Sequence, residues 1–112
     1  MTRAEIPAAL LGDVKNHLNI TWDDEATDNK VRGHAAAASV YLDGKAGERL
    51  DYDADGLART LLMEYVRYAR DEALDVFENN YRPMILSLQN ERAVSGYVES
   101  PESAKTRDHA EL

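Results

Sequence analysis

Residues 55–77 read DGLARTLLMEYVRYARDEALDVF, and this stretch decides the fold. Its apolar residues recur three or four positions apart, which gives an α-helix one wide apolar face over about six turns. After Gly56 no glycine or proline interrupts the pattern, and most of its residues favour helix. We therefore expect one long central helix over residues 55–77, capped by the side chain of Asp53 or Asp55. The polar residues expected on its other face are Arg59, Glu64, Arg67, Arg70, Asp71, Asp75 and Glu78.

Two shorter helices are expected before and after this stretch. The first is predicted for residues 8–18, with Asn19 as its stop, because Leu and Val recur there at helical spacing. After the central helix, the sequence ENNYRP at residues 78–83 indicates a helix end followed by a new start at its proline. The last helix is therefore predicted to be short, over residues 83–92.

A further helix is predicted for residues 23–43. Thr21 with Asp24 three positions later resembles a capping box, with Asp in place of the usual Glu or Gln. Gly33 lies in mid-helix, where it costs up to about 1 kcal/mol, and its presence suggests tight packing. Gly44 and Gly47 mark the helix end. The expected buried stripe contains Thr27, Val31, Ala35, Ala38 and Leu42.

The fold class predicted from these elements is all-α: a small bundle of about four helices around one long central helix. The helical domain is expected to span residues 1–92, with Leu50 and Tyr52 anchoring a connector onto the core. Residues 93–112 are polar and contain few bulky apolar groups, so they cannot bury enough surface to fold alone. We expect them to form a tail that becomes ordered only against a partner.

Composition narrows the function. The chain has 112 residues, which suits one domain, and a formal charge of −8. It offers no cluster of Lys and Arg of the kind that DNA binding requires. It has no cysteine, so disulfides and thiolate chemistry are excluded. No apolar run is long enough for a membrane span, and the first twelve residues or so are not expected to act as a signal peptide.

One motif resembles a metal site. Asp51, Asp53 and Asp55, followed by Gly56, copy the opening of an EF-hand calcium loop, but Leu62 occupies the position that requires a bidentate Glu. An acidic capping loop is the preferred interpretation. The histidines and carboxylates form no recognisable catalytic or metal-ligand spacing, so we expect no enzymatic activity, metal or cofactor.

The order of features resembles that of a known family. The stretch ITWDDEATD at residues 20–28, the helix ending YLDGKAG, the acidic turn DYDADGLA and the helix around YVRYA resemble the head–tail connector proteins of long-tailed phages, also called head completion or adaptor proteins. The segment NNYRPMILSLQNER continues the resemblance, which covers about residues 10–92.

This resemblance implies a small α-helical subunit that forms a ring, expected to be dodecameric, beneath the portal protein of the capsid. The ring would extend the DNA channel and dock the next neck or tail protein, while genomic DNA passes without specific binding. The implied location is the neck of the virion, and the host cytoplasm before assembly. A ring needs contacts between two different patches of each subunit.

Candidate patches follow from charge and aromatic character. Trp22 with Asp23, Asp24 and Glu25 is expected to face Arg67 and Arg70 of a neighbouring subunit. Trp22 is also expected to be partly exposed, as aromatic residues at interfaces are. Tyr97 and Val98 in the tail are expected to contact a partner surface.

A different class of function stays open. A small acidic helical regulator that binds one protein partner, including a mimic of DNA, would have the same composition and fold. The mass of the protein in solution and inside assembled particles distinguishes the two hypotheses, because a regulator need not form a ring.

Overall fold

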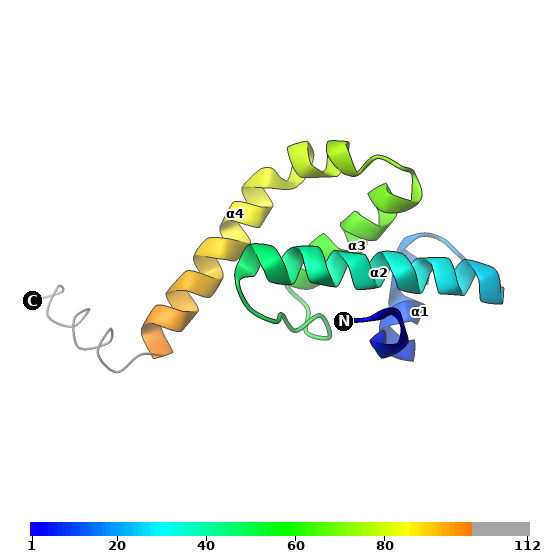
Figure 1. Ribbon diagram of the computed structural model, residues 1–112, viewed down its shortest axis with the longest axis horizontal. Coiled ribbons are helices and arrows are strands. Elements are labelled where there is room, and N and C mark those ends of the chain that lie inside the picture. The colour runs from blue at the N-terminus through cyan, green and yellow to red at the C-terminus, as the bar shows by residue number, and fades with distance from the viewer. Residues whose placement is uncertain (100–112) are drawn as a thin grey trace, which may run out of the picture.

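The computed structural model describes residues 1–99, with side chains to residue 94. This part of the chain is all-α, as predicted, with one 3-10 helix, four α-helices and no strand. The elements are η1 (Arg3–Glu5), α1 (Ala8–His17), α2 (Glu25–Ala46), α3 (Leu57–Arg70) and α4 (Leu74–Glu99), as Figure 1 shows.

The predicted central helix is two helices. α3 ends at Arg70, and Glu72 adopts the left-handed conformation with φ of 56°. The N–H of Ala73 then donates to the carbonyl of Tyr68 at 2.8 Å, which is the hydrogen bond that closes a Schellman motif. One left-handed residue therefore ends α3 and lets α4 begin at Leu74. The prediction of a continuous helix over residues 55–77 is wrong.

α4 is the longest helix, and the prediction of a short one over residues 83–92 is also wrong. It passes through the predicted break and carries Pro83 inside it. Figure 1 shows α4 bent along its length, and an internal proline removes one helical hydrogen bond and bends a helix. The predicted tail boundary at residue 93 lies within α4, because the helix continues to Glu99. The rest of the expected tail, residues 100–112, lies outside the described residues.

The ends of α2 are fixed by a cap and a glycine. Asp24 is the N-cap, and its side chain accepts hydrogen bonds from the backbone N–H of Thr27 at 3.0 Å and from its hydroxyl at 2.7 Å. Thr21 is therefore not the cap, and the helix begins two residues later than predicted. Gly47, with φ of 78°, ends α2 in the left-handed region that glycine adopts without strain.

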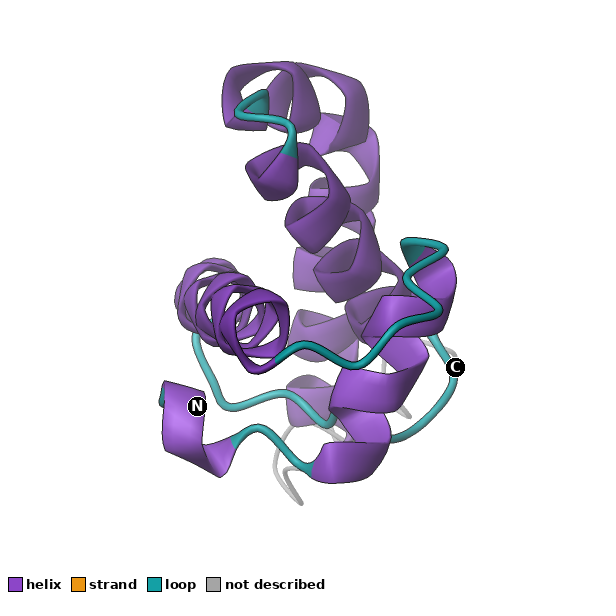
Figure 2. Ribbon diagram, turned by 90° about the vertical axis from the view of Figure 1, so that its right-hand side faces the viewer, coloured by secondary structure: helices purple, strands orange, loops and turns teal. Residues whose placement is uncertain are grey.

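α2 and α3 form the centre of the molecule, and α4 returns along α3 after the break. Figure 2 looks almost along α2 and shows the other α-helices gathered to one side of it. The buried face of α2 carries the small residues Ala35, Ala38 and Ser39, which are fully buried and leave room for the neighbouring helices to pack closely. The predicted stripe on α2 is confirmed except at Thr27, which is half-buried. The larger core residues that surround it include Leu10, Val14, Leu42, Leu61, Leu62, Val66, Phe77 and Leu88.

Aromatic rings join the three longest helices. Phe77 of α4 is fully buried and packs against Tyr65 at 5.4 Å and against Tyr81 at 5.1 Å between ring centroids. Tyr41 of α2 and Tyr68 of α3 complete the group, each within 6.3 Å of Phe77. Favourable ring pairs add roughly 0.5–1.5 kcal/mol each beyond their buried area. This cluster holds α4 against α2 and α3.

Candidate functional site

A charged hollow lies where α2 begins and α3 ends. Its volume is about 390 Å³. α2 contributes Lys30 and His34, α3 contributes Arg70, and the left-handed Glu72 completes the rim. The antiparallel packing of α2 against α3 brings these residues together although up to 42 positions separate them in sequence.

Positive charge dominates around His34. Burial lowers the pKa of His34, and the positive charges of Arg3, Arg70 and Lys30 lower it further. The ion pairs among the described residues involve other cations, so Arg3, Lys30 and Arg70 have no carboxylate partner there. In a chain of formal charge −8, three such cations around one half-buried imidazole form a locally basic site.

Gly33 explains how Arg3 reaches this site. A Cβ built on Gly33 would lie 2.6 Å from Nη2 of Arg3, which is closer than real Cβ contacts occur. Tight packing at Gly33 was predicted, and it is confirmed. The neighbouring group is the guanidinium of Arg3, which belongs to η1. The glycine therefore lets the Arg3 guanidinium lie across α2, one residue from His34.

A second hollow of about 420 Å³ shares Arg70 with the first. It is lined by His17 and Asn19 at the end of α1 and by Arg67 and Asp71 near the end of α3. Asn19 is left-handed, with φ of 61°, and ends α1 where the sequence predicted a stop. Arg70 thus stands between two adjoining hollows at one end of the molecule.

Glu64 connects three helices beneath the second hollow. Its Oε1 lies 2.9 Å from Nε2 of His17, and the hydroxyl of Tyr81 donates to its Oε2 at 3.0 Å. Arg67 lies 3.7 Å from the same Oε2. Burial and the hydrogen bond to Glu64 raise the pKa of Tyr81 to about 12. Both carboxylate oxygens are engaged, so this cluster joins α1, α3 and α4.

The sequence pattern placed Glu64 on the solvated face, and this is wrong, because its side chain is only 12% exposed. Its contact with His17 spans 47 residues, so no local spacing could have revealed it.

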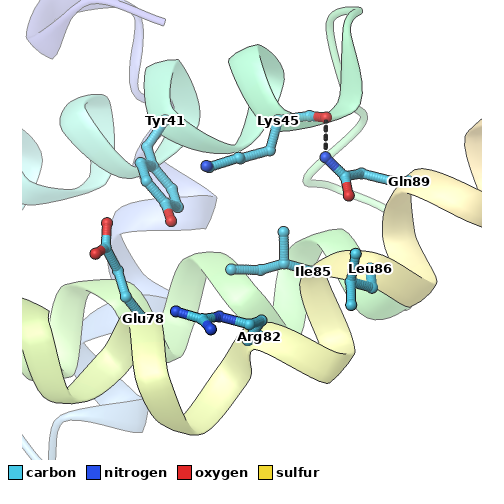
Figure 3. Close-up of a pocket in the computed structure, with 7 residues that line it drawn as sticks. All are labelled: Tyr41, Lys45, Glu78, Arg82, Ile85, Leu86 and Gln89. Atoms are coloured by element: carbon cyan, nitrogen blue, oxygen red, sulfur yellow. Dashed lines mark hydrogen bonds between the residues drawn. The ribbon is translucent and has the colours of Figure 1, made fainter.

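Figure 3 shows a smaller groove, of about 190 Å³, between the end of α2 and the middle of α4. Ile85 and Leu86 form an apolar side, while Arg82 lies opposite Lys45. Leu86 has a large apolar side chain, yet this side chain is 54% exposed. The amide of Gln89 donates to the carbonyl of Lys45 at 3.0 Å and satisfies one of the last carbonyls of α2.

The DYDADG loop lies at the other end of α2 and α3. Asp51, Asp53 and Asp55 are exposed, and the side chain of Asp51 accepts from the N–H of Asp53 at 2.9 Å. The N-cap of α3 is Gly56, with no side-chain cap, so the prediction that Asp53 or Asp55 caps this helix is wrong. In residues 1–94 no group of three or more acidic or histidine side chains is placed to hold a metal ion.

Tyr52 holds this loop in place, as predicted. It is 4% exposed, and its hydroxyl donates to Oδ1 of Asp43 at 2.6 Å. The same oxygen accepts from the N–H of Leu50 at 3.1 Å, and Arg59 donates to the carbonyl of Tyr52 at 2.7 Å. Burial and the hydrogen bond to Asp43 raise the pKa of Tyr52. The three exposed carboxylates therefore project from a loop whose position is fixed.

The predicted interface residues lie mostly near the basic end. Trp22 is 49% exposed, as expected, and Glu25 is exposed beside it. Asp23 lies 3.1 Å from Nζ of Lys15, and Asp24 caps α2, so both acids already have partners within the subunit.

Of the two predicted arginines, Arg67 is paired with Glu64 at 3.7 Å, and Arg70 faces the two hollows. Lys30, His34 and Arg3, which share the site with Arg70, were not predicted. Tyr97 and Val98 belong to α4 by their backbone, and their side chains lie outside the described residues.

Comparisons with protein-family models, with curated proteins and with solved structures find no match to this chain. No helix in the described part of the chain is both long and apolar enough to cross a membrane.

Proposed function

We propose that this chain is a structural subunit of the head–tail connector of a tailed phage, forming a ring below the portal. The observation that carries the proposal is the presence of a basic hollow and an acidic loop at opposite ends of α3. Three cations without a carboxylate partner among the described residues surround His34 where α2 begins and α3 ends, and three exposed carboxylates lie on the loop between α2 and α3. A ring is built from heterologous contacts, in which two different patches of each subunit meet.

Exposed apolar groups support an assembling protein. Trp22 is 49% exposed and Val40 is 65% exposed. Aromatic and aliphatic side chains that are exposed in the free subunit become the buried centre of interfaces in an assembly. We choose the phage connector as the assembly because residues 10–92 resemble connector proteins.

In this role the ring extends the DNA channel and docks the next neck or tail protein. Its partners are copies of itself, the portal protein and that next protein, and its place is the neck of the virion after synthesis in the host cytoplasm. With a formal charge of −8 the ring repels passing DNA and does not hold it.

The test is the presence and geometry of this chain in assembled particles. We expect mass spectrometry of purified phage particles to find it in a fixed ratio to the portal protein. A reconstruction of the neck should show α2, α3 and α4 repeated around the channel. Particles that lack the chain at full infectious yield would overturn the proposal.

The second candidate is a small acidic regulator of one protein partner, including a mimic of DNA. The observation in its favour is the fixed loop at residues 51–55, which presents three exposed carboxylates at alternate positions. A regulator would be found in one-to-one complexes with a partner and would be absent from particles.

A further inference from the structure

We propose that the acidic loop at residues 51–55 of one copy of this chain docks into the basic hollow of Lys30, His34 and Arg70 on the next copy. The inference rests on the proposed ring and identifies the contact that builds it. It differs from the pairing expected from sequence, in which Asp23, Asp24 and Glu25 faced Arg67 and Arg70.

The loop is a ready ligand for a basic site. The side chain of Asp55 is fully exposed, and its closest cation, Arg59, is 3.9 Å away. Asp51 and Asp53 are exposed as well, and no cation pairs with them among the described residues. Because Tyr52 fixes the loop, docking orders few additional groups, and little conformational entropy is lost.

The hollow carries the opposite charge to the loop. Lys30 and Arg70 line it, Arg3 lies against the neighbouring turn of α2, and Glu72 is the one acid on the rim. Arg3, Lys30 and Arg70 all lie close enough to His34 to lower its pKa, so cations outnumber acids around the hollow. Carboxylates from outside the subunit would neutralise cations that have no carboxylate partner among the described residues.

The loop and the hollow of one subunit are too far apart to contact each other, so the proposed contact is made between copies. The loop connects the end of α2 to the start of α3, whereas the hollow lies at the start of α2 and the end of α3. α3 has 14 residues, so about 21 Å of helix separates the two sites. Loop and hollow are different patches at opposite ends, and their contact is heterologous and propagates from copy to copy.

A second copy fits the hollow better than nucleic acid does. A nucleic-acid backbone carries negative charge at every nucleotide along its whole length, which is more than the three cations around the hollow can neutralise. The loop of the next copy brings only a few carboxylates on a short, fixed turn. The contact should weaken as salt rises, because exposed charges are screened within about 8–10 Å at ordinary ionic strength.

Two charge-reversed variants test the contact. The first carries Lys30→Glu with Arg70→Glu and has an acidic hollow and an acidic loop. The second carries Asp53→Lys with Asp55→Lys and has a basic hollow and a basic loop. We expect each variant alone to self-associate roughly tenfold or more weakly than the unchanged protein in sedimentation equilibrium at high protein concentration. An equal mixture should recover association, because every loop then meets a hollow of opposite charge.

Matched controls change the same charges elsewhere. Lys45→Glu with Arg82→Glu reverses two cations in the groove of Figure 3, and Asp75→Lys with Glu91→Lys reverses two exposed acids of α4. These variants should associate like the unchanged protein. Circular dichroism and thermal melting verify that all four variants are folded.

The titration of His34 gives a second readout that uses the unchanged protein and therefore does not depend on whether the variants fold. Docked carboxylates should raise the pKa of His34, so its ring resonances should titrate at higher pH in concentrated than in dilute samples. Association of both variants at the level of the unchanged protein, or failure of their mixture to associate, would overturn the contact. If the mixture recovers association while particles lack the chain, the contact stands and the connector function fails.

Discussion

In residues 1–99, two residues other than glycine adopt left-handed backbone, Asn19 and Glu72, and each ends a helix. Asn tolerates this conformation because its short side chain can bond locally, whereas Glu gains nothing comparable. Asn19 was recognisable in the sequence as a helix end, whereas neither propensity nor periodicity could detect the helix end at Glu72. The missed helix end is therefore the one at which an unsuited residue carries the strain.

Replacing Glu72 by Gly should raise the free energy of unfolding by about 0.5–1 kcal/mol, because glycine adopts positive φ without a steric penalty. Asn19→Gly is the control and should change stability less. Urea unfolding measures both. A loss of stability in Glu72→Gly would show that the side chain contributes more than the backbone costs.

His34 should make the fold sensitive to mild acid. Its pKa is lowered in the folded state, so between its ordinary value of about 6.5 and that lower value the unfolded chain binds a proton that the folded chain does not. Stability should therefore fall as the pH drops through about 6.5. The charged groups that face His34 are Arg3, Lys30, Arg70 and the rim carboxylate of Glu72.

The measurement compares the unchanged protein with His34→Gln in dilute solution. Urea unfolding at pH 7.5 and at pH 5.5 should show a smaller loss for the variant, because glutamine does not titrate. Equal losses in the two proteins would mean that other groups cause the acid sensitivity.

At the scale of elements, the apolar stripe over residues 55–77 identified most of the buried face, but Val76 is 41% exposed and the predicted length of the helix is wrong. Leu61, Leu62, Val66 and Phe77 are all fully buried, yet the break at Glu72 separates Phe77 from the others. The stripe continues across the break because both helices bury residues in the same core. Periodicity indicates most of the residues that are buried, but it cannot show that the chain has changed direction.

The opposite error occurred at Pro83. An internal proline costs roughly 3 kcal/mol, so the sequence favoured a helix boundary there. α4 continues because Pro83 is exposed and because buried residues on both sides of it, Phe77, Ile85 and Leu88, hold the helix against the core. Tertiary packing thus outweighs a strong local preference.

Leu62→Ala tests the packing of α3. Leu62 is fully buried, so the substitution should lower the free energy of unfolding by about 2–5 kcal/mol. Leu86→Ala is the matched control, since Leu86 is 54% exposed and should cost far less. Denaturant unfolding gives both values, and a loss below about 0.5 kcal/mol at Leu62 would contradict the observed core.

At the scale of the whole molecule, the sequence predicted the fold class and one member of the basic site, Arg70. The other members come from η1 and α2, and only the antiparallel packing of α2 on α3 brings them to Arg70. The acidic loop was visible from sequence because its residues are contiguous. A contiguous motif can be read directly, whereas a site assembled from three elements requires the topology.

Calcium should leave the thermal stability unchanged. The position that requires a bidentate Glu is Leu62, which is buried in the core and cannot be a ligand. A ligand that binds only the folded state must raise the melting temperature. Scanning calorimetry with saturating calcium, compared with magnesium, measures this, and a clear rise with calcium alone would contradict the interpretation.

The hairpin-like succession of α2, α3 and α4 also bears on how fast the chain folds. α3 packs chiefly against its two neighbours in sequence, and most contacts in the described chain join residues fewer than 12 positions apart. Chains with such low contact order fold in microseconds to milliseconds. Each newly synthesised copy should therefore fold within milliseconds, and the proposed ring would assemble from subunits that are already folded.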